Sequence, residues 1–213
     1  MTEPVTPKPT LRGVLHQYAA AAAVGAGLVL VAVAPGGRAT IAVAVFAASL
    51  VLQFAVSATL HRGHWTGRTR AWLRRLDHAA IFVLIAGTYT PFVLVGLPAE
   101  RGWWLLGAIW AGAGIGVLYC LAYLRAAKRW RSGLALALGW SIAPYIPDVR
   151  AAYGDGIFGF LLAGGCLYTV GAVVYATERP TLWPSTFGFH EAFHLLTVAA
   201  ASLHFAGVLA IVS

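Results

Sequence analysis

The sequence has little charge, and most of that charge has one sign. Only 10% of its 213 residues are Asp, Glu, Lys or Arg, with seven acidic residues against fifteen basic ones. Soluble globular domains are about 25% charged, so this chain lacks the polar surface that such a domain needs. Its 60% hydrophobic content and mean hydropathy of +0.77 predict an integral membrane protein.

Cysteine is also scarce. Cys120 and Cys166 stand alone, without CxxC or Cys/His spacing. Both fall in apolar runs, where cysteine behaves as a small hydrophobic residue. The N-terminal sequence MTEPVTPKPT lacks the basic-then-apolar pattern of a cleavable signal peptide. We therefore expect the first apolar segment to direct its own membrane insertion.

What the chain does have is a series of apolar runs, most of them near the 20 residues that span a hydrocarbon core of about 30 Å. Their positions predict an all-α, polytopic, seven-transmembrane helix bundle. The predicted spans cover approximately residues 14–34, 40–60, 79–97, 103–124, 134–146, 156–176 and 189–212. Residues 1–11, with three prolines, are expected to form a disordered lead-in to a single membrane domain, residues 12–213.

The fifth span is the shortest. It contains Pro144 and is followed by Pro147, so it could be tilted, packed deep in the protein or partly re-entrant.

The basic residues predict the orientation. If the N-terminus is cytoplasmic, only Arg38, Arg101 and Arg150 of the fifteen basic residues face outward. Cytoplasmic loops are the ones enriched in Lys and Arg, so we expect a multi-pass cell-membrane protein with its N-terminus inside and its C-terminus outside. The same distribution accounts for the formal charge of +8 and predicts membrane lipids as partners, with no role in nucleic-acid binding.

Three histidines fall at one predicted membrane face. His190 and His194 are four residues apart, so on a helix they share a face with Cβ atoms about 5–6 Å apart. His61 ends the second span, and Asp77 begins the third on the same side. Three imidazoles and a water match an open tetrahedral zinc site. We therefore predict Zn²⁺ bound by His61, His190 and His194.

Asp77 is predicted to hold the water or orient a histidine. Zinc would lower the pKa of a bound water to about 7, which would let it attack a lipid amide or ester carbonyl. Polar residues every four positions on the second span should form an inward-facing stripe leading to the site; they are Ser49, Gln53, Ser57 and His61.

His204 shares the face of His190 but lies about 21 Å deeper along a helix of 1.5 Å rise per residue. It therefore cannot bind the same ion, and we interpret it as a packed, hydrogen-bonded intramembrane histidine.

Simpler interpretations remain open for each residue. His190 and His194 could be interfacial histidines satisfied by water or loops, His61 a helix-end residue stabilised by the helix dipole, and Asp77 an N-cap. Four others are interpreted as structural or solvated: His16, His64, His78 and Glu191.

Several motifs together resemble the hemolysin III family, the bacterial branch of the progestin and adipoQ receptor superfamily, which includes the adiponectin receptors. They are Ser57-Ala-Thr-Leu-His61, Leu76-Asp77-His78, Ile85-Ala-Gly-Thr-Tyr-Thr-Pro-Phe92, Gly139-Trp140, Gly164-Gly165-Cys-Leu-Tyr168 and Phe187-Gly-Phe-His190-Glu191-Ala-Phe-His194.

The resemblance implies seven helices, a cytoplasmic N-terminus and a zinc ion near the cytoplasmic leaflet. It implies His61, His190 and His194 as ligands, Asp77 in contact with the zinc-bound water, and Ser57 as the motif serine. One departure is Arg12, which stands where the family usually has Asn, four residues before His16.

These observations favour a zinc-dependent hydrolase of lipid amides or esters, such as ceramide-like lipids, with Asp77 and Ser57 as catalytic residues. One alternative is a non-enzymatic sensor or transducer of membrane state with a structural zinc, involved in membrane homeostasis. A second is a pore-forming cytolysin, which ranks last because the polar stripe does not continue through the membrane.

Overall fold

The computed structural model describes residues 8–122 and 128–213, and this part of the chain is helical, with no β-strand. The elements are α1 (Val14–Val33), α2 (Gly37–Arg62), α3 (Gly67–Gly96), α4 (Ala99–Ala122), α5 (Lys128–Gly139), the 3₁₀ helix η1 (Trp140–Tyr145), α6 (Ile146–Thr177) and α7 (Phe189–Val212). The predicted all-α class is confirmed. Residues 1–7 of the expected lead-in and position 124, the predicted end of the fourth span, lie outside the described residues.

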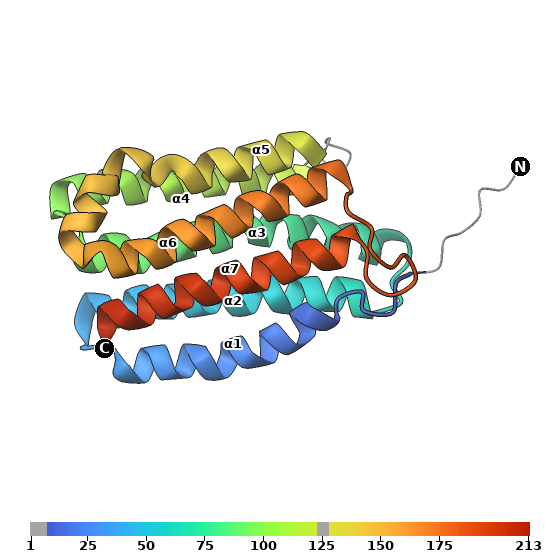
Figure 1. Cartoon of the computed structure of the whole chain (residues 1–213), viewed down its shortest axis with the longest axis horizontal. Coiled ribbons are helices and arrows are strands. Elements are labelled where there is room, and N and C mark those ends of the chain that lie inside the picture. The colour runs from blue at the N-terminus through green and yellow to red at the C-terminus, as the bar shows by residue number, and fades with distance from the viewer. Residues whose placement is uncertain (1–7, 123–127) are drawn as a thin grey trace, which may run out of the picture.

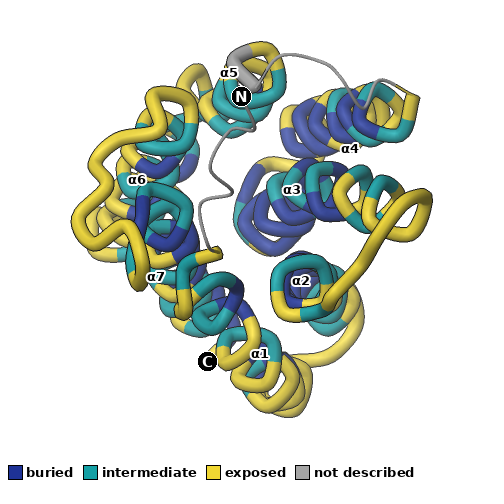
Figure 2. Tube along the Cα trace, turned by 90° about the vertical axis from the view of Figure 1, so that its right-hand side faces the viewer, coloured by how far each residue is buried: buried dark blue, intermediate teal, exposed yellow. Residues whose placement is uncertain are grey.

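The helices lie side by side and the chain reverses direction between them (Figure 1). As a result α1, α3 and α7 begin at the end of the bundle where α2 and α6 finish, and we call this the histidine end. Seen along the bundle (Figure 2), α3 is flanked by α2 and α4. The apolar window of α3 is 67% buried inside the molecule, against 22% for α1, so α3 is central to the packing.

In the described part of the chain, six helical segments are long and apolar enough to cross a membrane, so the predicted count of seven is not supported. The predicted fifth and sixth spans fall within one run of helical residues, Trp130–Thr177. The backbone of this run breaks at Gly154, whose φ of 74° and ψ of 175° are non-helical. Pro144 lies inside η1 and Pro147 in the first turn of α6, a position where the missing N–H of proline costs no helical hydrogen bond. Pro147 therefore fits the start of α6, and the break in the helical run lies at Gly154.

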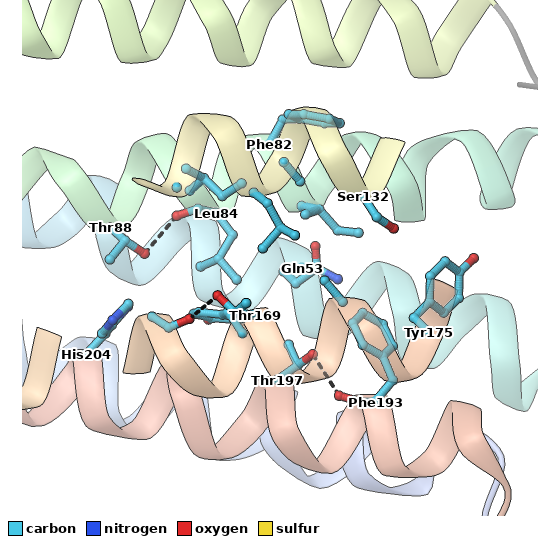
Figure 3. A pocket seen from close by; sticks show the side chains of 18 of the residues that line it. Gln53, Phe82, Leu84, Thr88, Ser132, Thr169, Tyr175, Phe193, Thr197 and His204 are labelled. Atoms are coloured by element: carbon cyan, nitrogen blue, oxygen red, sulfur yellow. Dashed lines mark hydrogen bonds between the residues drawn. The ribbon is translucent and has the colours of Figure 1, made fainter. Parts of the chain in front are cut away.

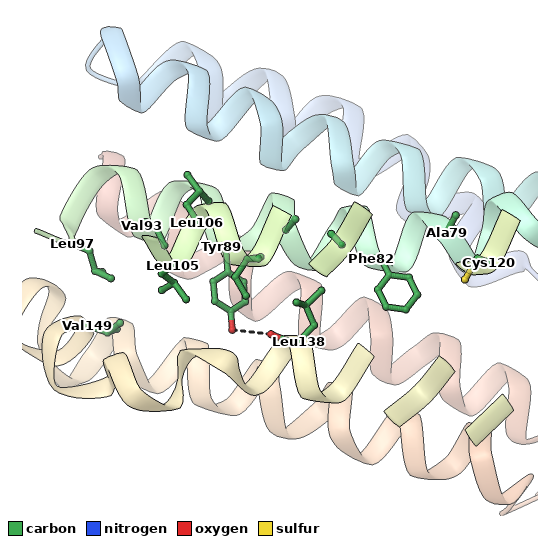
Figure 4. Close-up of a cluster of buried hydrophobic side chains, with 13 residues drawn as sticks. Ala79, Phe82, Tyr89, Val93, Leu97, Leu105, Leu106, Cys120, Leu138 and Val149 are labelled. Carbon is green, nitrogen blue, oxygen red and sulfur yellow. Dashed lines mark hydrogen bonds between the residues drawn. The ribbon is translucent and has the colours of Figure 1, made fainter. Parts of the chain in front are cut away.

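Two apolar clusters hold the bundle together. One joins α3 to α4 and α5, with Phe82 and Ile109 each 1% exposed (Figure 4). The other joins α1, α2, α3 and α7 through residues such as Leu30 and Phe46. The Tyr89 hydroxyl donates a hydrogen bond to the carbonyl of Gly139 at 2.7 Å, which fixes the end of α5 against α3.

Candidate metal centre

The last turn of α2 places the first candidate ligand. Ser49, Gln53 and Ser57 are 3%, 4% and 1% exposed, so the predicted polar stripe faces the interior. His61 follows one turn later, in the last turn of α2, and therefore lies on the same face at the histidine end.

The start of α7 carries the other two candidate ligands, His190 and His194. The backbone N–H of Gly188, its N-cap residue, donates a hydrogen bond to Oε2 of Glu191 at 2.8 Å, which satisfies a helix-terminal N–H. His190 and His194 follow on the helix face directed at α2. Nε2 of His190 lies 3.2 Å from Nε2 of His61, and one ligand atom from each of the three histidines lies within 4.8 Å of the others. The structure thus brings together the three predicted ligands.

This donor set fits zinc. Two nitrogens bound tetrahedrally at about 2.0–2.1 Å are separated by about 3.3 Å, close to the distance between His61 and His190. His194 is 2% exposed, and its Nδ1 is buried with no hydrogen-bond partner among the described residues. Imidazole nitrogens suit zinc and several other transition metals, so the cluster can hold such an ion.

Asp77 lies beside the cluster. Its Oδ2 is 3.9 Å from Nε2 of His61, and its carboxylate interacts with the Ser57 side chain. The alternative of Asp77 as an N-cap is wrong, because α3 begins ten residues earlier at Gly67, after Thr66. The predicted span started at residue 79 because residues 67–76 are too polar for a membrane core. In the structure, residues 67–76 nevertheless form the first turns of α3.

Other polar residues of the histidine end were interpreted as structural or solvated. His64 is exposed, in agreement. His16 and Glu191 are each 1% exposed and belong to the site. His16 stacks on His194 with 3.7 Å between ring centroids and 2° between planes, and Glu191 forms an ion pair with Arg12. From the sequence, the departure at Arg12 put a role for this motif in doubt.

Lys8 adds a further contact, because its ammonium donates a hydrogen bond to the carbonyl of His61. Burial, together with the positive charges of Arg12, Arg62 and Arg70, lowers the pKa of Lys8 from its ordinary value.

A cavity of about 290 Å³ extends from the three histidines into the bundle. Its walls come from α2, α3, α5, α6 and α7 and are mainly apolar, with isolated polar groups such as Gln53 and Thr197 (Figure 3). Tyr175 lines it near the histidine end and His204 lines it far inside. His204 Nε2 lies 3.1 Å from the Leu161 carbonyl, as expected for a packed, hydrogen-bonded residue. The cavity is thus a mainly apolar space that reaches the three histidines at one end.

A sequence profile of proteins described as haemolysin-III related matches residues 5–205. The chain belongs to the haemolysin-III related family. Hemolysin-3 of Bacillus cereus is 35% identical over 172 residues, which cover 80% of this chain and 75% of that protein. The Hemolysin-3 homolog of Bacillus subtilis strain 168 is 30% identical over 165 residues, covering 78% of this chain and 74% of the homolog.

A more distant relative of this haemolysin-III related protein is the adiponectin receptor protein of Drosophila melanogaster. It is 27% identical over 153 residues, which cover 63% of this chain but only 34% of the receptor. The predicted family resemblance is therefore confirmed. The six apolar helices agree with a multi-pass membrane protein.

Proposed function

We propose that this protein is a metal-dependent membrane hydrolase that cleaves amide or ester bonds of lipids, with ceramide-like lipids as one candidate class. The observation that carries the proposal is the group of three histidine donors, within 4.8 Å of one another, at one end of a mainly apolar cavity of about 290 Å³. Such a cavity can hold an acyl chain while its carbonyl lies at the histidines.

In this mechanism, separate residues bind the metal, accept the proton and orient the proton acceptor. His61, His190 and His194 would hold a zinc ion, which when bound supplies the Lewis acidity that makes water nucleophilic near neutral pH. The Asp77 carboxylate accepts a hydrogen bond from the attacking water and takes its proton. Ser57 orients that carboxylate through their side-chain interaction. The apolar walls exclude bulk water from the acyl chain.

We propose that the site lies at the cytoplasmic leaflet of the cell membrane. In this topology the N-terminus is cytoplasmic, the C-terminus is external, and α5 and η1 together form the fifth of seven crossings. The distribution of basic residues supports this orientation, and the reversal of chain direction between neighbouring helices (Figure 1) fits repeated crossing.

The test is to purify the protein in detergent, measure bound metal by elemental analysis, and follow hydrolysis of N-acyl and O-acyl lipids by mass spectrometry. We expect stoichiometric zinc and turnover of at least one lipid class. His194→Ala should abolish both. His64→Ala is the matched control, because His64 is exposed at the same end, and it should retain both. Unchanged hydrolysis by His194→Ala would refute the proposal.

A second candidate is a membrane-state sensor or transducer in which the metal only joins helices. The candidate ligands come from two helices, α2 and α7, and His61 and His190 are 129 positions apart in the sequence. A metal bound there would join these two helices, which favours this second function. In that case removal of metal lowers the melting temperature, and no lipid in the panel is hydrolysed. A cytolytic pore, suggested by the name of the Bacillus cereus relative, would instead produce ion flux in liposomes.

A further inference from the structure

The segment that precedes and opens α1 lies against the candidate metal centre. The backbone N–H of Thr10 donates to the Ser185 carbonyl at 3.0 Å, and the N–H of Leu11 donates to the Thr186 carbonyl at 3.3 Å. These bonds attach the segment to the loop that leads into α7. We call residues 8–16 the brace.

Arg12 connects the brace to the first turn of α7. Its guanidinium pairs with Oε1 of Glu191, while Oε2 of the same carboxylate accepts the N–H of Gly188. Glu191 is 1% exposed, so its charge is out of water and depends on Arg12 for compensation. Because Glu191 stands between the two histidines of α7, any rotation or fraying of that turn moves both rings.

Gly13 connects the brace to α2. A Cβ on Gly13 would lie 2.6 Å from Cβ of His61, and its φ of +78° is one that only glycine adopts easily. The backbone of the brace therefore packs directly on His61, at a distance that no side chain would allow.

His16 connects the brace to His194. The two rings are parallel and in contact, and neither ring nitrogen of His16 has a hydrogen-bond partner among the described residues. Histidine ligands are usually oriented by a hydrogen bond from the second ring nitrogen. Here the stacked ring of His16 restricts the rotation of the His194 ring that such a bond would otherwise prevent.

We propose that the brace positions the metal ligands: Arg12, through Glu191, sets the α7 turn that carries His190 and His194, and His16 sets the plane of the His194 ring. The reason is geometric, since ligands from separate helices must be held within about 0.5 Å of their productive arrangement. The inference rests on the metal centre of the proposed function. It adds Arg12, Glu191 and His16 as positioning residues.

The test measures Zn²⁺ affinity by chelator competition and the visible absorption spectrum with Co²⁺, on the full-length protein in detergent. Loss of an outer contact to a metal ligand typically costs 10–100-fold in metal affinity. We therefore expect Arg12→Leu to weaken Zn²⁺ binding by about that factor and to change the Co²⁺ spectrum. Arg12→Lys keeps the cation and should recover most of the affinity.

Arg101→Leu is the matched control. Arg101 pairs with Asp148 at 2.9 Å, at the opposite end of the bundle, so its loss removes an ion pair without touching the histidines. Its Zn²⁺ affinity and Co²⁺ spectrum should equal those of the unmodified protein. Equal weakening by Arg12→Leu and Arg101→Leu, or no weakening by Arg12→Leu, would overturn the proposal.

Two further variants keep the test decisive if Arg12→Leu does not fold. Glu191→Gln retains an acceptor for Gly188 but removes the ion pair, and should weaken Zn²⁺ binding. His16→Ala removes the stacked ring and should broaden or shift the Co²⁺ spectrum. If the Co²⁺ spectra of Glu191→Gln and His16→Ala both equal that of the unmodified protein, the role of the brace is refuted. If the unmodified protein binds neither Zn²⁺ nor Co²⁺, the metal centre itself is refuted, which is a different result.

Discussion

At the residue scale, the role of the Asp77 side chain depends on where its helix, α3, begins. The sequence leaves two roles open, a helix cap and a partner of the histidines, because hydropathy places the start of the span next to it. In the structure Asp77 is well inside α3, 9% exposed and beside His61. A buried carboxylate next to the candidate metal centre is suited to accept a proton.

Replacement of Asp77 by asparagine tests that role. Asn keeps the size and hydrogen bonding of the side chain but cannot accept a proton, so lipid hydrolysis should fall by about 10²–10⁴-fold, the usual contribution of a general base. Bound zinc, measured by elemental analysis, should stay at the unmodified level. Asp155→Asn, at an exposed residue paired with Arg150, serves as control. A fully active Asp77→Asn protein would exclude Asp77 from the chemistry.

His16 is the residue that sequence reasoning placed least well. The His190 and His194 pair is predictable because a four-residue spacing on one helix is local. No local pattern relates His16 to His194, which come from the first and last helices and meet only in the folded bundle. A lone histidine in an apolar run is therefore correctly read as structural until the fold is known.

At the element scale, the packing of α2 on α3 sets the position of His61 relative to Asp77. The two helices approach closely at Gly87, where a Cβ would collide with the Ser49 side chain. Small residues at helix crossings are the usual means of close approach in membranes. The GTYTPF motif thus contributes a packing position in addition to its family signature.

Gly87→Ala should destabilise the protein. The added methyl overpacks the α2–α3 contact, which costs about 1–3 kcal/mol and should lower the melting temperature in detergent. Gly114→Ala is the control, because a Cβ at that exposed α4 position would meet no side chain or other helix within 4 Å in the described part of the chain. Since alanine favours helix over glycine by about 0.5–1 kcal/mol, it should be neutral or stabilising. A higher melting temperature for Gly87→Ala would contradict the close packing.

In the stretch that runs from α5 through η1 to α6, proline positions alone do not locate the helix boundary. Proline usually ends a helix, so Pro144 and Pro147 predict a boundary. Whether a proline breaks a helix depends on where its missing N–H falls. Pro147 lies in the first turn of α6, which tolerates that loss, and the run breaks at Gly154 instead. The span count therefore could not be obtained from proline positions alone.

At the scale of the whole molecule, the proposed orientation can be tested by labelling. In a background without Cys120 and Cys166, Arg68→Cys in the first turn of α3 and Ser213→Cys at the C-terminus each place one exposed thiol at opposite ends of the bundle. A membrane-impermeant maleimide applied to intact cells should label position 213. Position 68 should react only after permeabilisation. The reverse pattern would place the histidine end outside and overturn the orientation.

The class of the protein, its apolar segments, its family and the spacing of His190 and His194 all follow from the sequence by itself. They depend on composition and on short-range periodicity, which the order of residues states directly. The tertiary structure decided the break at Gly154 within Trp130–Thr177, the place of Asp77 within α3, and the brace. These depend on contacts between distant parts of the chain, such as Arg12 and Glu191, which are 179 positions apart. Such a contact forms only when folding brings the two groups together, and the burial of Glu191 makes its charge depend on that partner.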